Sequence, residues 1–138
     1  MSTIVPMKII ADTNIFLATV LNEPEKSAII DVTLGQELVA PEVLPYEIGN
    51  ALSAAVKRNR LTINEALHLH QCTMAIPVEL RITDIANALE IACTHNISAY
   101  DAYFLECALA TRAPLLTLDR GMREIAQGLG IKILEMKL

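Results

Sequence analysis

Four acidic residues occupy positions in this sequence where carboxylates can act together on a cation. Asp12 and Asp119 each end an apolar, strand-like run and open a helix. Glu47 and Asp101 are each the third residue of a predicted helix. Carboxylates that converge repel one another unless a cation joins them. No histidine or cysteine lies near them in the sequence, and an all-oxygen set suits Mg²⁺ or Mn²⁺ better than zinc.

Each of these acids also has a purely structural explanation. Asp12 and Asp119 can be the N-caps of the helices that they open. Glu47 suits a first helical turn through the helix dipole, and Asp101 can form a capping box with Ser98. Taken one at a time, these explanations are at least as good as a functional one, so the functional interpretation depends on the joint pattern.

The elements that would position the acids alternate between two kinds. Short, mostly apolar runs predict five strands: Met7–Ala11, Glu37–Ala40, Ile76–Leu80, Leu115–Leu118 and Ile131–Leu134. Segments with a helical apolar period fill the gaps: Asn14–Leu21, Glu25–Leu34, Pro45–Arg58, Ile63–Thr73, Asp84–Thr94, Ala99–Thr111 and Arg120–Leu129. Strands that are apolar on both faces are typical of a parallel sheet covered by helices. The alternation predicts a three-layer α/β fold, and we expect residues 1–138 to form a single domain.

A parallel sheet would gather the acids at its carboxyl edge. Helices that follow strands begin at this edge, which would place Asp12, Glu47 and Asp119 there. The helix of Asp101 leads into the fourth strand, so its start would lie at the same edge if it packs antiparallel to that strand. Apolar residues flank Glu47 and Asp101 at helical spacing, and no Lys or Arg lies three or four residues from either. A carboxylate in such surroundings is costly unless it is paired or bound to a metal.

At these positions the sequence resembles the PIN-domain family, in particular its VapC-like ribonuclease toxins. The matching segments, in chain order, are Asp12-Thr13-Asn14, Pro45-Tyr46-Glu47-Ile48-Gly49-Asn50-Ala51-Leu52, Ala99-Tyr100-Asp101-Ala102 and Thr117-Leu118-Asp119-Arg120. The resemblance covers nearly the whole chain. It implies a central five-stranded parallel sheet flanked by helices, a metal-dependent endoribonuclease that cleaves RNA with Mg²⁺ or Mn²⁺, a homodimer, and a tightly bound antitoxin protein.

Carried over residue by residue, the resemblance assigns roles to the four acids. Asp12 and Asp101 are our choice for the primary metal ligands. Glu47 and Asp119 would complete the shell, position a second ion or orient the attacking water. Asn14 and Thr117 match supporting polar positions of the family, and the hydroxyls of Thr13 and Thr117 are candidates to hold ligands or phosphate.

Other functions are less consistent with the sequence. The first strand–helix turn contains no glycine, which excludes a dinucleotide or P-loop phosphate site there. A phosphatase of the haloacid-dehalogenase type needs a second acid where this chain has Asn14. Two alternatives stay open, namely a stand-alone PIN nuclease in RNA processing and a non-catalytic PIN-like module that binds a partner. The presence of all four acids argues against the second.

Charge and aromatic content say little about the substrate. The formal net charge is −5, from 16 acidic and 11 basic residues. Without the four candidate acids, 12 acidic residues face 11 basic ones, so most of the excess negative charge belongs to the predicted metal site. Lys57, Arg58, Arg60, Arg120 and Arg123 can contact phosphates, although charges after helices are more often solvated faces. Five aromatic residues predict no stacking platform for bases.

The sequence also predicts where the protein acts and which surface a partner covers. No apolar run is long enough to span a membrane, and Met1–Pro6 has no signal-peptide pattern. Three widely spaced cysteines suggest buried, inert thiols, so a cytoplasmic location is expected. The predicted helix Asn14–Leu21 is apolar nearly all round, and the predicted helix Glu25–Leu34 has a similarly broad apolar surface. They are expected to line a partner groove through Phe16 and Leu17, unless the two helices simply cover one another.

Overall fold

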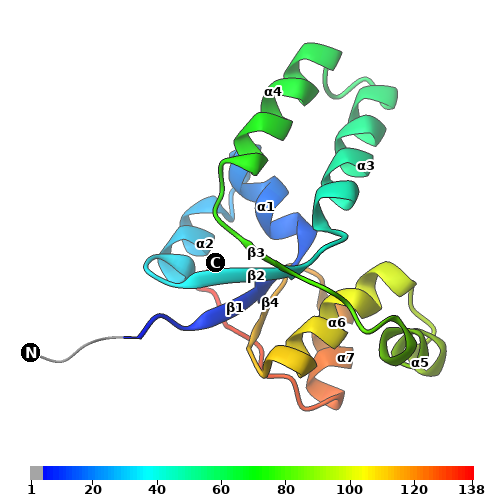
Figure 1. Cartoon of the computed structure of the whole chain (residues 1–138). Coiled ribbons are helices and arrows are strands. Elements are labelled where there is room, and N and C mark those ends of the chain that lie inside the picture. Colours follow the sequence, from blue (N-terminus) through cyan, green and yellow to red (C-terminus); the bar gives the residue numbers. More distant parts are fainter. Residues whose placement is uncertain (1–4) are drawn as a thin grey trace, which may run out of the picture.

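The computed structural model describes residues 5–138, which form a parallel sheet between two groups of helices (Figure 1). The strands in this part of the chain are β1 (Lys8–Ala11), β2 (Glu37–Pro41), β3 (Glu79–Arg81) and β4 (Leu115–Leu116). The helices are α1 (Thr13–Val20), α2 (Lys26–Thr33), α3 (Leu44–Lys57), α4 (Ile63–Met74), α5 (Ile85–His95), α6 (Ala99–Thr111) and α7 (Arg120–Gly128). The strand order is β3-β2-β1-β4, and every pair is parallel.

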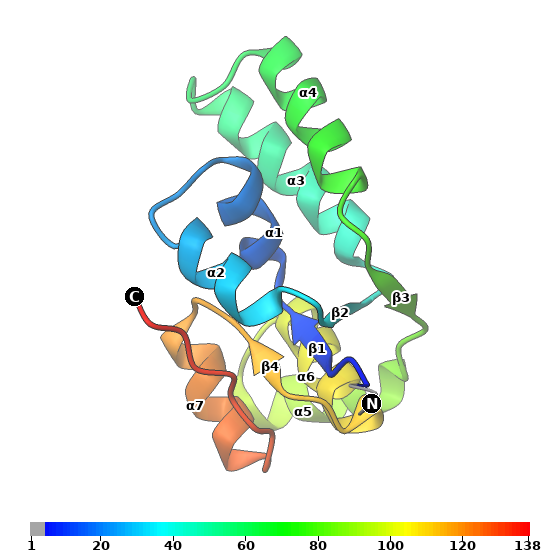
Figure 2. The same ribbon diagram turned by 90° about the vertical axis from the view of Figure 1, so that its left-hand side faces the viewer.

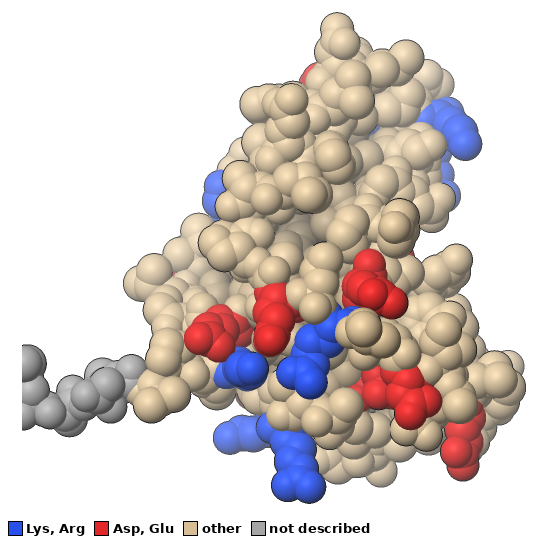
Figure 3. Space-filling model, in the orientation of Figure 1, with Lys and Arg blue, Asp and Glu red and all other residues tan. Residues whose placement is uncertain are grey.

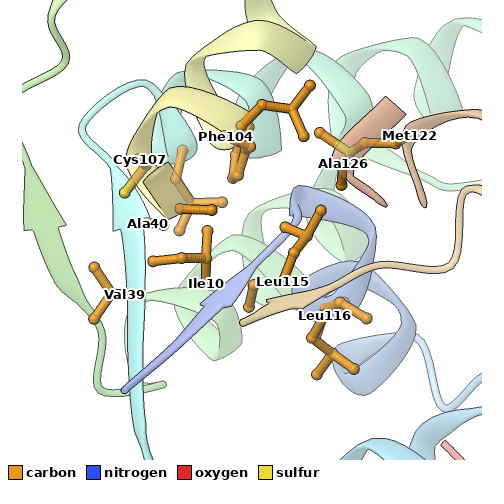
Figure 4. Close-up of a cluster of buried hydrophobic side chains, with 14 of the residues drawn as sticks. Ile10, Val39, Ala40, Phe104, Cys107, Leu115, Leu116, Met122 and Ala126 are labelled. Atoms are coloured by element: carbon orange, nitrogen blue, oxygen red, sulfur yellow. The ribbon is translucent and has the colours of Figure 1, made fainter. Parts of the chain in front are cut away.

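Helices cover both faces of this sheet. Figures 1 and 2 show α1 and α2 on one face, with the α3–α4 hairpin extending beyond it, and α5, α6 and α7 on the opposite face. The predicted α/β fold with a parallel sheet is therefore confirmed. Because β1 is central and covered from both sides, Ile9, Ile10 and Ala11 are fully buried. In Figure 4, Phe104 of α6 and Met122 of α7 lie on the same side of the sheet, over Ile10.

The sheet differs from the prediction at its two edges. Ile131–Leu134 does not form a fifth strand in the described chain but makes one isolated parallel bridge, from Ile133 to Leu115. The Leu115 N–H donates to the Lys132 carbonyl (2.9 Å). The last predicted strand therefore pairs with β4 at a single residue, because β4 itself has only two residues.

The other edge strand, β3, begins later than predicted and is exposed throughout. The predicted strand started at Ile76, but the Ile76 N–H donates to the Thr73 carbonyl (3.1 Å), so Ile76 lies in the turn that follows α4. Pro77 follows and has no N–H to donate to a strand ladder. The interpretation of this run as apolar on both faces is wrong, because Glu79, Leu80 and Arg81 all face solvent.

The first two helices bury more than the sequence suggested. Phe16 is 2% exposed and packs in the hydrophobic core, so the prediction that it lines a partner groove is wrong. Leu17 is half-buried against the same core. The exposed apolar residues of this region lie at the ends and the outer side of the helices, at Leu21, Ile30 and Leu34.

Two local predictions have clear outcomes in the structure. The capping box at the start of α4 is confirmed, because the Glu65 N–H donates to Thr62 Oγ1 (3.1 Å) and the Thr62 N–H donates to Glu65 Oε1 (2.9 Å). The prediction of buried thiols holds only for Cys107, where burial raises the thiol pKa to about 11. Cys72 is half-buried and Cys93 is exposed.

Within residues 5–138, no helix has the length and apolar character needed to cross a membrane. The expectation that the chain starts without a signal peptide rests largely on residues 1–4, which lie outside the described residues.

Candidate active site

The pairing of β1 with β4 places Asp12 beside Thr117. Ala11 pairs with Leu116 in the sheet, so the residues that follow each strand emerge side by side at the carboxyl edge. The Thr117 hydroxyl donates to Asp12 Oδ2 (2.7 Å) and accepts from the Asp119 N–H (3.0 Å). Asp12 is 8% exposed and Thr117 is 1% exposed. A buried hydroxyl thus fixes the orientation of the Asp12 carboxylate.

Asp12 and Asp119 also cap the helices that they open. The Asn14 N–H donates to Asp12 Oδ1 (3.4 Å), and the Met122 N–H donates to Asp119 Oδ1 (3.0 Å). A Cβ at position 121 would lie 3.3 Å from Asp119 Oδ1, so Gly121 leaves room for this cap. The structural explanation is therefore correct for both acids. It does not exclude a second role, because the outer oxygen lone pairs of a capping carboxylate stay available.

The remaining two acids start helices on opposite faces of the sheet. Glu47 lies in the first turn of α3, and Asp101 lies in the first turn of α6. The Asp101 N–H donates to Ser98 Oγ (3.1 Å), so Ser98 caps α6 as predicted. Glu47 Oε1 and Thr13 Oγ1 are buried and have no hydrogen-bond partner within residues 5–138. A buried oxygen without a donor is costly, so Glu47 Oε1 has the capacity to accept a contact from a bound group.

The titration of Glu47 is strongly perturbed by its surroundings. Burial is the main cause, and the charges of Asp12 and Asp101 add to it, so that the pKa of Glu47 rises from 4.5 to about 7. The nearby Thr13 hydroxyl acts against this rise in pKa. At neutral pH this carboxyl group is therefore poised between its protonated and charged forms.

Burial and neighbouring charges also act on two other acids. Burial raises the pKa of Asp12, the Thr117 hydrogen bond opposes that rise, and the charges of Asp101 and Asp119 add to it. Burial likewise raises the pKa of Asp101, the charge of Asp119 adds to this, and Ser98 acts in the opposite direction. The charge of at least one other acid of the set thus raises the pKa of Asp12, of Glu47 and of Asp101. The structure brings Asp12, Glu47, Asp101 and Asp119 together at one edge of the sheet.

The predicted supporting residues differ in what they contribute. Thr117 holds Asp12, and Thr13 places a buried hydroxyl near Glu47. Asn14 is exposed, and its backbone N–H, not its side chain, contacts Asp12. All three residues were expected to support the site, and in the structure the side chains of the two threonines lie near the acids.

The donor set suits a hard cation held in an open site. All four side chains offer carboxylate oxygens, and Glu47 Oε1 lacks a hydrogen-bond donor in the described chain. Nowhere in residues 5–138 do three or more His, Cys, Asp or Glu side chains stand close enough to enclose an ion. Mg²⁺ is commonly bound by one or two carboxylates together with waters and substrate phosphates, not by a cage of protein ligands. The residues present fit that mode of binding.

Tyrosines next to these acids were missed by the sequence analysis. Tyr46 precedes Glu47 and is 78% exposed, and Tyr100 precedes Asp101 and is 56% exposed. Tyr100 packs edge-to-face against Tyr103, with ring centroids 5.9 Å apart. Tyr46 and Tyr100 each directly precede a candidate acid in the sequence. This adjacency could have identified them, whereas the total number of aromatic residues could not.

Comparison with known proteins supports the resemblance found in the sequence. The PIN domain family model matches residues 9–128. Ribonuclease VapC3 from Pyrobaculum aerophilum is 29% identical over 123 residues, which cover 86% of this chain and 94% of that protein.

Solved structures share the fold at lower sequence identity. PAE2754 from Pyrobaculum aerophilum superposes with a TM-score of 0.70 at 20% identity, covering 88% of this chain and 87% of that chain. VapBC2 from Rickettsia felis, solved with a DNA fragment from its promoter, gives 0.65 at 13% identity, with 95% and 100% covered. FitAcB from Neisseria gonorrhoeae gives 0.64 at 16% identity, with 92% and 96% covered. Because the family match spans most of the sequence and the fold agrees, this chain belongs to the PIN-domain family.

Proposed function

We propose that this protein is a metal-dependent endoribonuclease and the toxin of a toxin–antitoxin pair. The observation that carries the proposal is the convergence of four carboxylates at one sheet edge, where a buried oxygen of Glu47 has no donor within the described residues. The similarity to Ribonuclease VapC3 supports RNA as the substrate class. Mg²⁺ or Mn²⁺ is the proposed cofactor, because the donor set consists of carboxylate oxygens.

In this proposal the acidic residues of the chain have different roles in binding the cation and in catalysis. Asp12 and Asp101 would hold the cation, and Thr117 keeps the Asp12 carboxylate in place. When bound, the ion supplies positive charge that stabilises the negative charge developing on the scissile phosphate. Glu47 and Asp119 would complete the shell, position a second ion or orient the attacking water. The pKa of Glu47, about 7 in the metal-free protein, also suits a group that accepts a proton from that water.

Incubation of the protein with total cellular RNA tests this function directly. We expect fragments to appear with Mg²⁺ or Mn²⁺, to be absent with EDTA, and to return when excess Mn²⁺ is added. The products would be resolved on denaturing gels and their ends mapped. Cleavage that persists in EDTA would contradict the metal dependence. Intact RNA under every metal condition would contradict the nuclease itself and favour the non-catalytic module.

The antitoxin is the partner that we propose for the apolar groove between α3 and α4. The groove has a volume of about 350 Å³, and Leu52 and Val56 of α3 face Ile63 and Leu67 of α4 across it. Ile63 and Leu67 are 67% and 60% exposed, so α4 presents apolar side chains to solvent. Exposed apolar grooves of this kind accept an amphipathic helix. One chain of the VapBC2 complex shares the fold of this protein, and this similarity supports a protein partner.

A charged side chain in this groove is expected to weaken antitoxin binding at least tenfold. Leu67→Asp places a carboxylate where apolar contacts would form, and its exposure means that the fold should tolerate it. Co-purification with the product of the neighbouring gene, followed by titration calorimetry, measures the effect. Leu34→Asp is the comparison variant, because Leu34 is an exposed leucine on the surface that the sequence favoured. If only Leu34→Asp lost antitoxin binding, the partner site would lie on the surface of α2 and not in the groove between α3 and α4.

A homodimer is the other assembly that we propose, on the family resemblance. Light scattering of the purified protein would test it, and a mass that stays at 15.1 kDa over the micromolar range would contradict it.

A further inference from the structure

All three tyrosines of the chain lie on the helices that carry Glu47 and Asp101. Tyr46 is in the first turn of α3, and Tyr100 and Tyr103 are in the first two turns of α6. Consecutive Cα atoms lie about 3.8 Å apart, so Tyr46 starts within one residue of a candidate catalytic carboxylate. An aromatic cluster beside the acids is thus built into both helices.

Tyr46 and Tyr103 line the same hollow, which has a volume of about 380 Å³. Its other walls are Glu42 and Val43 before α3, and Thr83 and Ile85 at the start of α5. Three segments that are distant in the sequence therefore meet here, at the end of β2, after β3 and in α6 (Figure 1). The volume lies within the usual range for small-molecule sites, roughly 300–1,000 Å³.

The surroundings of this hollow favour an aromatic ligand. Tyr46 and Ile85 are 78% and 63% exposed, so the hollow offers ring and aliphatic surface that is open to solvent. A phenol ring has a flat apolar face on which any nucleobase can stack, and such stacking is worth roughly 5- to 150-fold in affinity per base. A single strand held at the carboxylates would pass the first turn of α3, where Tyr46 and Glu47 are consecutive residues.

The charges of the protein provide little attraction for RNA, so base stacking could contribute to affinity. The formal net charge is −5, which opposes the approach of an RNA backbone. On the face shown in Figure 3, the basic side chains of the described residues are mixed with acidic ones and form no continuous basic surface. Phosphate contacts on this face would therefore be weak, and base stacking is a source of affinity that does not depend on charge.

We propose that the hollow between Tyr46 and Tyr103 holds one unpaired nucleobase of the RNA, adjacent to the scissile phosphate. The base stacks on the exposed Tyr46 ring, and the half-buried Tyr103, held edge-to-face by Tyr100, forms the other aromatic wall. This inference rests on the proposed ribonuclease function and adds to it a position for one base of the substrate. The sequence-based expectation was that the chain has no stacking platform, and this proposal departs from it.

The test uses a short single-stranded RNA with one mapped cleavage position. Each nucleotide near that position is replaced in turn by an abasic one, and kcat and KM are measured with Mg²⁺. For the native protein, we expect one abasic position to raise KM about tenfold with little change in kcat. Tyr46→Leu should raise KM for the intact RNA by a similar factor and should lose its sensitivity to the same abasic position. Tyr46→Phe keeps the ring and should behave like the native protein.

Three outcomes would overturn the inference, and they can be told apart. If no RNA is cleaved, the proposed function fails and the inference fails with it. If cleavage is normal but no abasic position raises KM, or Tyr46→Leu keeps the full abasic effect, only the base site is wrong. If Tyr46→Leu lowers the mass in light scattering and leaves KM unchanged, the hollow belongs to an interface between two copies of the chain.

Discussion

Replacement of Asp12 by asparagine is expected to reduce RNA cleavage at least about 100-fold while the fold stays intact. Loss of a residue that only supports a metal ligand typically costs 10- to 100-fold, so loss of a charged ligand should cost more. Asparagine has nearly the same volume, and its oxygen can still accept from the Asn14 N–H. Initial cleavage rates with saturating Mg²⁺ measure the effect, and circular dichroism melting checks the fold.

Two further variants show whether this loss comes from the metal site. Thr117→Val keeps the side-chain shape but removes the hydroxyl that donates to Asp12, so an intermediate loss of about 10- to 100-fold is expected. Asp31→Asn makes the same chemical change on the exposed surface of α2 and should leave the rate unchanged. Full activity of Asp12→Asn, or an equal loss in Asp31→Asn, would contradict the assignment of the site. Asp101→Asn should behave as Asp12→Asn does.

The position of the acids could be predicted because the signals are local. Asp12 and Asp119 end apolar runs and cap helices, and Asp101 stands three residues after a capping serine. The contact between Asp12 and Thr117 could not be predicted in the same way. It joins residues 105 positions apart and depends on the pairing of β1 with β4, which the sequence pattern does not specify.

The parts of the fold that were wrong are those decided by neighbours in space. Phe16 lies on a helix that is apolar nearly all round. This pattern predicts that the helix is buried on several sides, but it does not identify the residues or the partner that bury it. In the structure, the core and the neighbouring helices cover Phe16, not a partner. Ile131–Leu134 has the composition of a strand, but its partner β4 is too short to form more than one bridge. Edge strands depend on such partners more than central strands do.

Without a divalent cation, the free energy of unfolding is expected to fall as the pH rises from about 5 to about 8. The folded-state pKa of Glu47, about 7, lies above its ordinary value of 4.5. Between these values the folded protein binds more protons than the unfolded chain, so folding is favoured at the lower pH and this advantage is lost as the pH passes 7. Because Glu47 is only half-buried, solvent screening reduces the effect to about 1 kcal/mol. Urea unfolding in EDTA at a series of pH values measures it, and Glu47→Gln should flatten the dependence.

Addition of Mn²⁺ or Mg²⁺ should reverse that trend, because the cation binds the charged carboxylates and removes their repulsion. At about 100 times the dissociation constant, binding to the folded state adds about 2.7 kcal/mol to the free energy of unfolding. Asp12→Asn should raise the melting temperature of the metal-free protein, since it removes a charge that Glu47 and Asp101 repel, and should lose most of the metal-induced increase. A melting temperature that does not change across millimolar Mn²⁺ at pH 7.5 would show that the four acids hold no cation. The structural explanation, in which Asp12 and Asp119 only cap α1 and α7, would then account for them.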